Sequence, residues 1–144
     1  MKINLRIAIS LLLVFALASA CDDEYFSEVP DVDVSTYFYL DEAEFFNFDT
    51  GMSLSFDDAG GYAGIILYCV QKDQSYHAFD LCCPIHYDEK EELVVDGAIA
   101  TCPTDSVYFI LSNTISSAID NDGNPAYLKS YKTSLSGSTL RVYN

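Results

Sequence analysis

Basic residues are scarce in this sequence. The chain has 7 Lys and Arg residues against 22 Asp and Glu residues, and two of the basic ones, Lys2 and Arg6, lie among the first 20 residues. Residues 21–144 therefore carry five basic and 22 acidic side chains, a formal charge of −17. A surface this acidic repels nucleic acid and anionic lipid headgroups, so we expect neither as a partner.

Helical periodicity and catalytic pairs are also missing. No stretch after residue 20 repeats apolar residues at a period of 3.6, which excludes long amphipathic helices. The chain has only two histidines, His77 and His86, and nothing near them identifies a nucleophile–base pair. Gly60, Gly61 and Gly64 are not followed by the lysine of a phosphate-binding loop, so we expect them to form a bend.

The first residues have the order of a secretory signal. Lys2 and Arg6 precede an apolar run at 7–18, and small residues at 18–20 lead to Cys21. A membrane-spanning helix needs roughly 20 apolar residues, so a permanent span is the weaker interpretation. The segment resembles the lipobox of bacterial lipoproteins, which implies that Cys21 is the cleavage and acylation site. Ordinary signal cleavage beside an unrelated cysteine is the alternative.

Three regions follow from this interpretation: a lipoprotein signal peptide at 1–20, an acidic tether at 21–30 and a single domain at 31–144. The acids at 22–24 resemble the export signals of surface lipoproteins in Bacteroidetes-like bacteria. We therefore expect a cell-envelope protein that is held to the outer membrane, and exposed at the cell surface, through lipid on Cys21.

The domain is expected to be all-β, because short runs rich in Tyr, Phe, Val and Ile alternate with Gly, Asp, Asn and Ser. The polar residues 71–74 predict one hairpin turn and 136–138 predict another. Residues 112–119 are expected to hold one helical turn at most. The predicted strands are residues 32–40, 63–70, 76–81, 93–95, 107–111, 127–135 and 139–143.

Residues 120–124 look superficially like a calcium-binding loop. Placing Gly123 at the sixth position of an EF-hand loop puts Lys129 at the twelfth, where a carboxylate is required. We therefore expect a tight turn without calcium.

Four cysteines follow Cys21, and an exported chain can form disulfides. Adjacent cysteines rarely bond each other without strain, so Cys82 and Cys83 are expected to be free or paired elsewhere. A Cys-Pro dipeptide occurs at Cys83 and again at Cys102, nineteen residues later. Two such turns suit a metal or disulfide site built from two loops. Four cysteines allow three complete pairings, and their spacing does not choose among them.

The region from residue 62 to 144 resembles a Rieske-type domain, the small all-β fold that holds a [2Fe–2S] cluster between two loops. The resemblance rests on the order and spacing of short segments. It implies an antiparallel β-sandwich with two ligand-type loops. The segments are 64–68 and 76–80 before the first loop, 102–103 and 106–108 around the second, and 124–126, 128 and 131 before the closing hairpin.

The ligand pattern of that family is incomplete here. A Rieske cluster takes two Cys on one iron and two His on the other. Cys83 and Cys102 match the cysteine positions, but Ile85 and Asp105 occupy the histidine positions. His86 is one residue late, and in an extended segment that shift reverses the side-chain direction. The resemblance therefore implies a Rieske-like fold that has lost its cluster.

The loss of the cluster has a consequence for the two remaining ligands. The family's auxiliary disulfide would need cysteines where Asp88 and Thr104 stand. Cysteines that once shared an iron lie close together, so the resemblance implies a bond between Cys83 and Cys102 in an oxidising compartment.

Four interpretations of function remain open. The favoured one is a non-enzymatic lipoprotein without a cofactor, whose domain binds an envelope or extracellular protein or ligand, or is structural. The second and third are an electron-transfer protein with an atypical [2Fe–2S] cluster and a zinc protein, both using Cys83, Cys102, His86 and Asp105. The fourth is a thiol–disulfide protein using Cys82 and Cys83, although this pair lacks Cys-x-x-Cys spacing.

Overall fold

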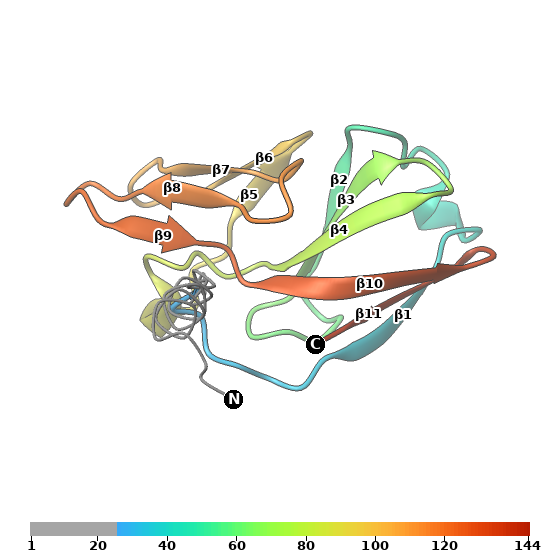
Figure 1. Ribbon diagram of the computed structural model, residues 1–144, viewed down its shortest axis with the longest axis horizontal. Helices are drawn as coiled ribbons and strands as arrows, with labels where there is room; N and C mark the ends of the chain where they lie inside the picture. Colours follow the sequence, from blue (N-terminus) through green and yellow to red (C-terminus); the bar gives the residue numbers. More distant parts are fainter. Residues whose placement is uncertain (1–25) are drawn as a thin grey trace, which may run out of the picture.

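The computed structural model describes residues 26–144, and this part of the protein is all-β (Figure 1). The predicted signal peptide, Cys21 and the first half of the tether lie outside the described residues. No helix within 26–144 is long and apolar enough to cross a membrane. The elements are β1 (Ser35–Tyr39), η1 (Ala43–Phe45), β2 (Ser53–Phe56), β3 (Ile65–Gln71), β4 (Ser75–Asp80), η2 (Tyr87–Glu89), β5 (Val94–Asp96), β6 (Ile99–Thr101), β7 (Tyr108–Ile110), β8 (Ser117–Ile119), β9 (Pro125–Tyr127), β10 (Ser130–Ser136) and β11 (Thr139–Tyr143).

The main sheet has six antiparallel strands in the order β1-β11-β10-β4-β3-β2. It is curled, because side chains from its two edge strands meet: the rings of Phe38 on β1 and Phe56 on β2 have centroids 4.9 Å apart. Phe45 of η1 packs against both rings. This cluster of phenylalanines closes one end of the core.

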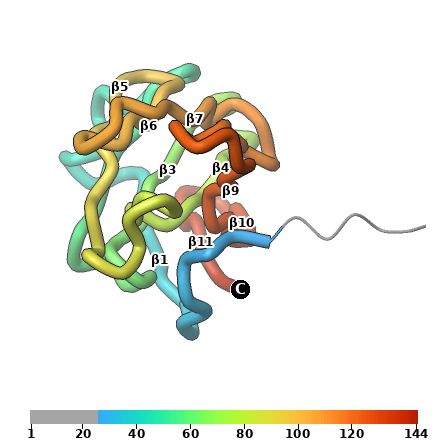
Figure 2. Tube along the Cα trace, turned by 90° about the vertical axis from the view of Figure 1, so that its left-hand side faces the viewer, coloured from blue at the N-terminus to red at the C-terminus, as the bar shows by residue number. Residues whose placement is uncertain are grey.

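Two smaller sheets lie at one end of the main sheet (Figure 1). Strands β5, β6 and β7 form one of them, and β8 pairs with β9 in the other. The turned view agrees, with β5, β6 and β7 above the strands β10, β11 and β1 (Figure 2). All of these small-sheet strands belong to the segment between β4 and β10, so this part of the molecule is an insertion in the main sheet.

Strand β3 is buried on both faces, which explains its uninterrupted apolar sequence. Ile65 and Leu67 face a core enclosed by the curled sheet. Ile66 and Tyr68 face a second core, which includes Phe109 from the small sheets. Burying both faces of one strand joins the main sheet to the insertion that carries the two cysteine loops.

Asp80, at the end of β4, holds the start of that insertion in place through hydrogen bonds. Its carboxylate is fully buried and accepts hydrogen bonds from the N–H groups of Tyr62 (2.5 Å), Ala63 (3.2 Å) and Cys82 (2.8 Å). The hydroxyl of Tyr131 donates a fourth bond at 2.6 Å. One carboxylate therefore joins the glycine-rich bend, the first cysteine loop and β10.

The glycine-rich bend is shaped to reach this carboxylate. Gly60, Gly61 and Gly64 all have positive φ, which confirms a bend before β3. A Cβ on Gly61 would lie 2.8 Å from Oδ2 of Asp80 and 2.5 Å from the Gly64 carbonyl oxygen. Only glycine allows the backbone to wrap the carboxylate this closely.

The all-β class and both predicted hairpins are confirmed, and several boundaries differ. Predicted strand 127–135 begins too early: Tyr127 is the last residue of β9, which pairs with β8, and β10, which pairs with β4 and β11, begins only at Ser130. Residues 112–119, for which one helical turn at most was expected, contain no helix, and 117–119 form β8. Val29, inside the predicted tether, is already buried. No strand was predicted at the positions of β2, β6 and β8.

Candidate functional site

The first cysteine loop, residues 81–93, joins β4 to β5 and is held by its own backbone. The Cys83 N–H donates to the carbonyl oxygen of Glu91 at 2.7 Å, and the His86 N–H donates to that of Cys83 at 3.2 Å. The Glu91 N–H returns a bond to the His86 carbonyl at 3.3 Å. These bonds fold the loop back on itself, with Cys83 fully buried at its base.

The second loop, residues 102–107, joins β6 to β7. The Cys102 N–H donates to the Val107 carbonyl oxygen at 2.8 Å, and the Ser106 N–H donates to that of Cys102 at 2.9 Å. Ser106 has a φ of 61°, in the left-handed region, which gives the loop its sharp reversal. Cys102 is fully buried and faces the first loop.

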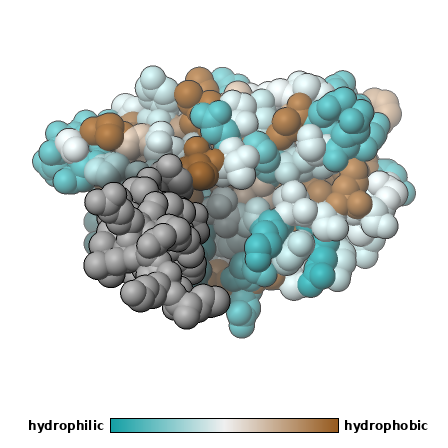
Figure 3. All heavy atoms as spheres, viewed as in Figure 1, coloured by the Kyte–Doolittle hydropathy of each residue, from teal (hydrophilic) through white to brown (hydrophobic). Residues whose placement is uncertain are grey.

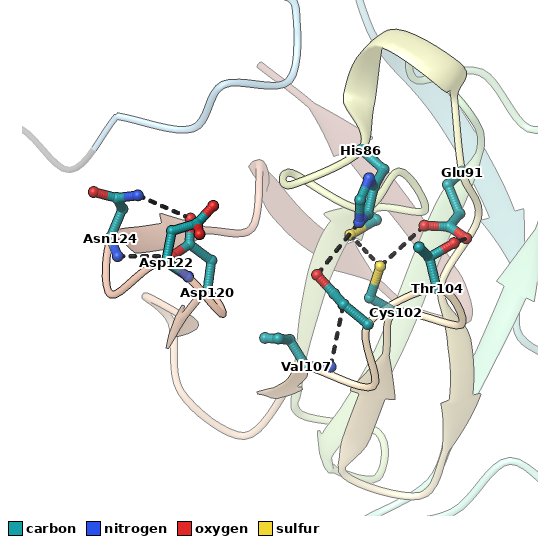
Figure 4. Close-up of polar contacts among 10 residues, drawn as sticks. His86, Glu91, Cys102, Thr104, Val107, Asp120, Asp122 and Asn124 are labelled. Atoms are coloured by element: carbon teal, nitrogen blue, oxygen red, sulfur yellow. Dashed lines mark hydrogen bonds and ion pairs between the residues drawn. The ribbon is translucent and has the colours of Figure 1, made fainter.

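The structure brings Cys83 and Cys102 together. Their Sγ atoms are 2.7 Å apart, compared with about 2.05 Å in a disulfide, and the structure has no bond between them (Figure 4). Burial raises the pKa of the Cys102 thiol, and its hydrogen bonds with Cys83 and Glu91 add to this effect. The sulfur atoms therefore have the proximity that a bond requires, and the disulfide itself stays a prediction.

His86 faces the second loop, so the expectation that its side chain points the other way is wrong. Its Nε2 lies 3.3 Å from Oδ2 of Asp105. The expectation assumed an extended segment, but residues 83–86 form a turn. Ile85, by contrast, packs against the second core and offers no ligand.

Asp105 is positioned by the second loop. Its Oδ1 accepts a bond from the Val107 N–H at 3.2 Å, which leaves Oδ2 directed at His86. The side chains of His86 and Asp105 are 27% and 11% exposed, so their contact lies at the rim of the buried sulfur pair. All four residues predicted to form a site are therefore on the two facing loops.

Glu91 is a fifth member of the site that sequence reasoning missed. Its Oε2 lies 3.1 Å from Sγ of Cys102, and its Oε1 accepts a bond from the Thr104 hydroxyl. The Thr104 bond lowers the pKa of Glu91. Glu91 stands among several acids at 88–92, and nothing in its spacing distinguishes it from them. Its role depends on the reversal of the loop, which the sequence did not reveal.

Cys82 does not share the sulfur pair. Its Sγ donates to the carbonyl oxygen of Cys83 at 3.5 Å, and its backbone pairs with Glu92. Burial raises the pKa of the Cys82 thiol to about 12, so it stays protonated at neutral pH. That property is opposite to the low pKa of a thiol–disulfide exchange cysteine. Cys69 is remote from Cys82, since it lies opposite Tyr76 in the β3–β4 hairpin.

Two overlapping sets of donor atoms could hold a metal ion. Cys83, Glu91 and Cys102 form one set, and His86, Cys102 and Asp105 form the other, with donor atoms in each within 4.8 Å of one another. The first set offers two sulfurs and an oxygen, and the second offers one sulfur, a nitrogen and an oxygen; both are donor types that zinc accepts. They do not fit a Rieske cluster, because Asp105 stands where the second imidazole is needed.

The predicted turn at 120–124 lies apart from these loops (Figure 4). Oδ1 of Asp120 accepts bonds from the N–H groups of Asp122 (2.9 Å) and Asn124 (2.7 Å), which is the bonding of a tight turn. Of the interactions of Asp120, the hydrogen bond from the Asn124 N–H does most to lower its pKa. The carboxylate therefore stabilises the turn.

Comparison with known proteins adds no assignment: no protein-family model matches the sequence, and no curated protein matches it significantly.

Proposed function

We propose that the protein is a lipid-anchored module of the cell envelope, with a Rieske-like domain that has no cluster and serves in binding or structure. The observation that supports this best is the composition of the two loops. They present two sulfur atoms on one side, but a contact between His86 and Asp105 on the side where a cluster needs two imidazoles. Such loops retain the framework of a cluster site with its two cysteines but without its two histidines.

A disulfide between Cys83 and Cys102 would join the loops in the place of iron. The two sulfur atoms are 2.7 Å apart in a protein expected outside the reducing cytosol. For a separation of nineteen residues, the chain-entropy model gives a stabilisation of roughly 3 kcal/mol. The bond would hold the two loops of the insertion together.

Spectroscopy and metal analysis of the purified protein test the proposal. We expect a colourless protein without iron, and a tryptic map without reductant in which the peptides containing Cys83 and Cys102 are joined. Visible absorbance with two equivalents of iron would refute the cluster-free domain and favour the electron-transfer interpretation. Separate peptides in the iron-free protein would refute the disulfide.

The anchor is tested separately from the domain. Cys21→Ala should abolish incorporation of labelled fatty acid and release the protein from membranes, because no acyl acceptor remains. Asp23→Asn changes a neighbouring residue but keeps the cysteine, so this control should label normally. Unchanged labelling of Cys21→Ala would refute the anchor.

A zinc site is the second candidate, and the position of Glu91 favours it. A carboxylate oxygen 3.1 Å from Sγ of Cys102 adds a hard ligand to two sulfurs. The bound ion would hold the loops together through protein ligands, which is a structural role. Stoichiometric zinc in protein with free Cys83 and Cys102 thiols would establish this candidate, and Glu91→Gln should then weaken zinc retention.

A further inference from the structure

The outward face of β1, β11 and β10 differs in chemistry from the rest of this acidic protein. The registers of these strands place nine outward side chains in three cross-strand rows. Their inward neighbours, such as Phe38 and Leu140, belong to the core. The rows are Ser35–Tyr143–Lys132, Tyr37–Arg141–Ser134 and Tyr39–Thr139–Ser136.

No carboxylate occurs among these nine side chains, although the chain contains 22 Asp and Glu residues. Three of the nine residues are tyrosines, four are Ser or Thr, and the remaining two are the cations Lys132 and Arg141. Tyr37 and Tyr39 are about half exposed, at 51% and 50%. Hydrophilic groups gather over β10 and β11 in the space-filling view (Figure 3).

Arg141 is held in place at the centre of this face. Its guanidinium lies 4.8 Å from the ring centroid of Tyr143 and 5.7 Å from that of Tyr37. One of its nitrogens donates to the Ser35 hydroxyl at 3.1 Å. A guanidinium has five N–H donors, and among residues 26–144 Arg141 has no carboxylate partner. The structure thus presents an ordered cation with donors left for a ligand.

A hollow lies beside the first of these rows. It has a volume of about 530 Å³, and Lys132 and Tyr143 line it together with His77, Thr114 and Ser130. No Asp or Glu side chain is among its lining residues, although Lys129, which also lines it, pairs with the exposed carboxylate of Asp31. Lys132 is exposed and has no ion pair within the described chain, while its Nζ lies 6.0 Å from the Tyr143 ring centroid. The volume falls in the range of small-ligand sites.

We propose that this face, defined by the nine residues above and continued into the hollow, binds an acidic saccharide. The flat carbon face of a pyranose ring stacks on tyrosine, and its hydroxyls exchange hydrogen bonds with Ser and Thr side chains. A sugar carboxylate or sulfate pairs with the planar donors of Arg141 and with Lys132. The absence of carboxylates from the face matches an anionic ligand.

Single-stranded nucleic acid also uses aromatic rings and cations. Its affinity comes mainly from phosphate contacts, whereas this face offers two cations and many hydroxyl groups. A short acidic saccharide, whose ring hydroxyls can bond the Ser and Thr side chains, is therefore the better match. The inference rests on the binding role proposed above, but it concerns a surface formed by β1, β10 and β11 rather than the cysteine loops.

Titration calorimetry of the full-length protein with tetragalacturonate tests the inference, with uncharged maltotetraose as the comparison ligand. We expect saturable binding of tetragalacturonate and at least tenfold weaker binding of maltotetraose. Arg141→Gln should weaken tetragalacturonate binding about tenfold or more, because a charge-assisted bidentate contact is lost. Arg141→Lys should also weaken it, since lysine lacks the planar fork.

Lys72→Gln is the matched control. Lys72 is an exposed cation in the β3–β4 turn, where it pairs with Asp49. Lys72→Gln changes the net charge by the same amount as Arg141→Gln and should leave the affinity for tetragalacturonate within twofold. The inference is overturned by no binding, by equal binding of both sugars, by equal losses in Arg141→Gln and Lys72→Gln, or by tighter binding of a thymidine oligonucleotide. If binding fails in protein that is colourless and carries the expected disulfide, only this inference falls.

Discussion

The buried carboxylate of Asp80 should be the most sensitive polar group for stability in the described chain. Its two oxygens accept four hydrogen bonds, two on each oxygen. Asp80→Asn keeps the shape but replaces one acceptor oxygen with an NH₂ donor. In either orientation of the amide, the NH₂ group faces two hydrogen-bond donors. At least one of these is a backbone N–H, which cannot rotate to find another acceptor.

The expected cost follows from those lost bonds. A buried donor left without its acceptor costs about 1–3 kcal/mol, so Asp80→Asn should lower the free energy of unfolding by roughly 3 kcal/mol. A domain of this size unfolds in urea with a slope near 1.5 kcal/mol per M, which predicts a midpoint about 2 M lower. Because total stability is usually 5–15 kcal/mol, this loss is large.

Urea unfolding followed by tyrosine fluorescence measures this change. Asp58→Asn is the matched control, since Asp58 is an exposed acid in the preceding loop and its loss should shift the midpoint by less than about 0.3 M. Tyr131→Phe, which removes one of the four donors, should cost less than Asp80→Asn. A loss below about 1 kcal/mol in Asp80→Asn would refute the view that this carboxylate fastens the insertion.

Three further predictions concern the cysteines, the loops and the bend. Cys82 should react with iodoacetamide at pH 8 roughly a thousandfold more slowly in native than in unfolded protein, because its pKa is about 12 and the thiolate is the reactive form. Rapid labelling of the native protein, measured by mass spectrometry, would contradict this. Glu91 has a lowered pKa, so its stabilisation is present above the unfolded value and is lost as pH falls through the folded one; Glu91→Gln should be less stable than wild type at pH 7, with the difference vanishing in acid unfolding curves. Gly64→Ala should lower stability by at least about 2 kcal/mol in urea, since its φ is 130° and a Cβ would lie 2.7 Å from the Phe56 carbonyl oxygen; an unchanged midpoint would show that the bend adjusts.

Local patterns in the sequence predicted the parts of the fold that depend on neighbouring residues. The polar residues 71–74 define the turn and register of the β3–β4 hairpin, and this register places Cys69 opposite Tyr76. Strands β6 and β8 have three residues each, too few to show an alternation that distinguishes them from loops. The curl of the main sheet depends on Phe38 meeting Phe56, a contact between the strands at opposite edges of the sheet, which no local pattern shows.

The candidate site shows the same division between local and long-range information. The repeated Cys-Pro dipeptide and the resemblance led to Cys83 and Cys102, whose sulfur atoms the fold does bring together. The predicted direction of the His86 side chain assumed that the backbone between residues 83 and 86 is extended. An extended segment turns alternate side chains to opposite faces, but a turn with an N–H to carbonyl bond across three residues does not.

That turn also explains why Glu91 belongs to the site. When the segment after Cys83 reverses, the chain returns antiparallel to itself, and the Glu91 carbonyl accepts from the Cys83 N–H. The side chain of Glu91 is then carried to Sγ of Cys102, eleven residues away in sequence. A loop that kept the extended course would have placed neither His86 nor Glu91 beside the second loop. The backbone hydrogen bonds of the first loop therefore determine which chemistry the two sulfur atoms can share.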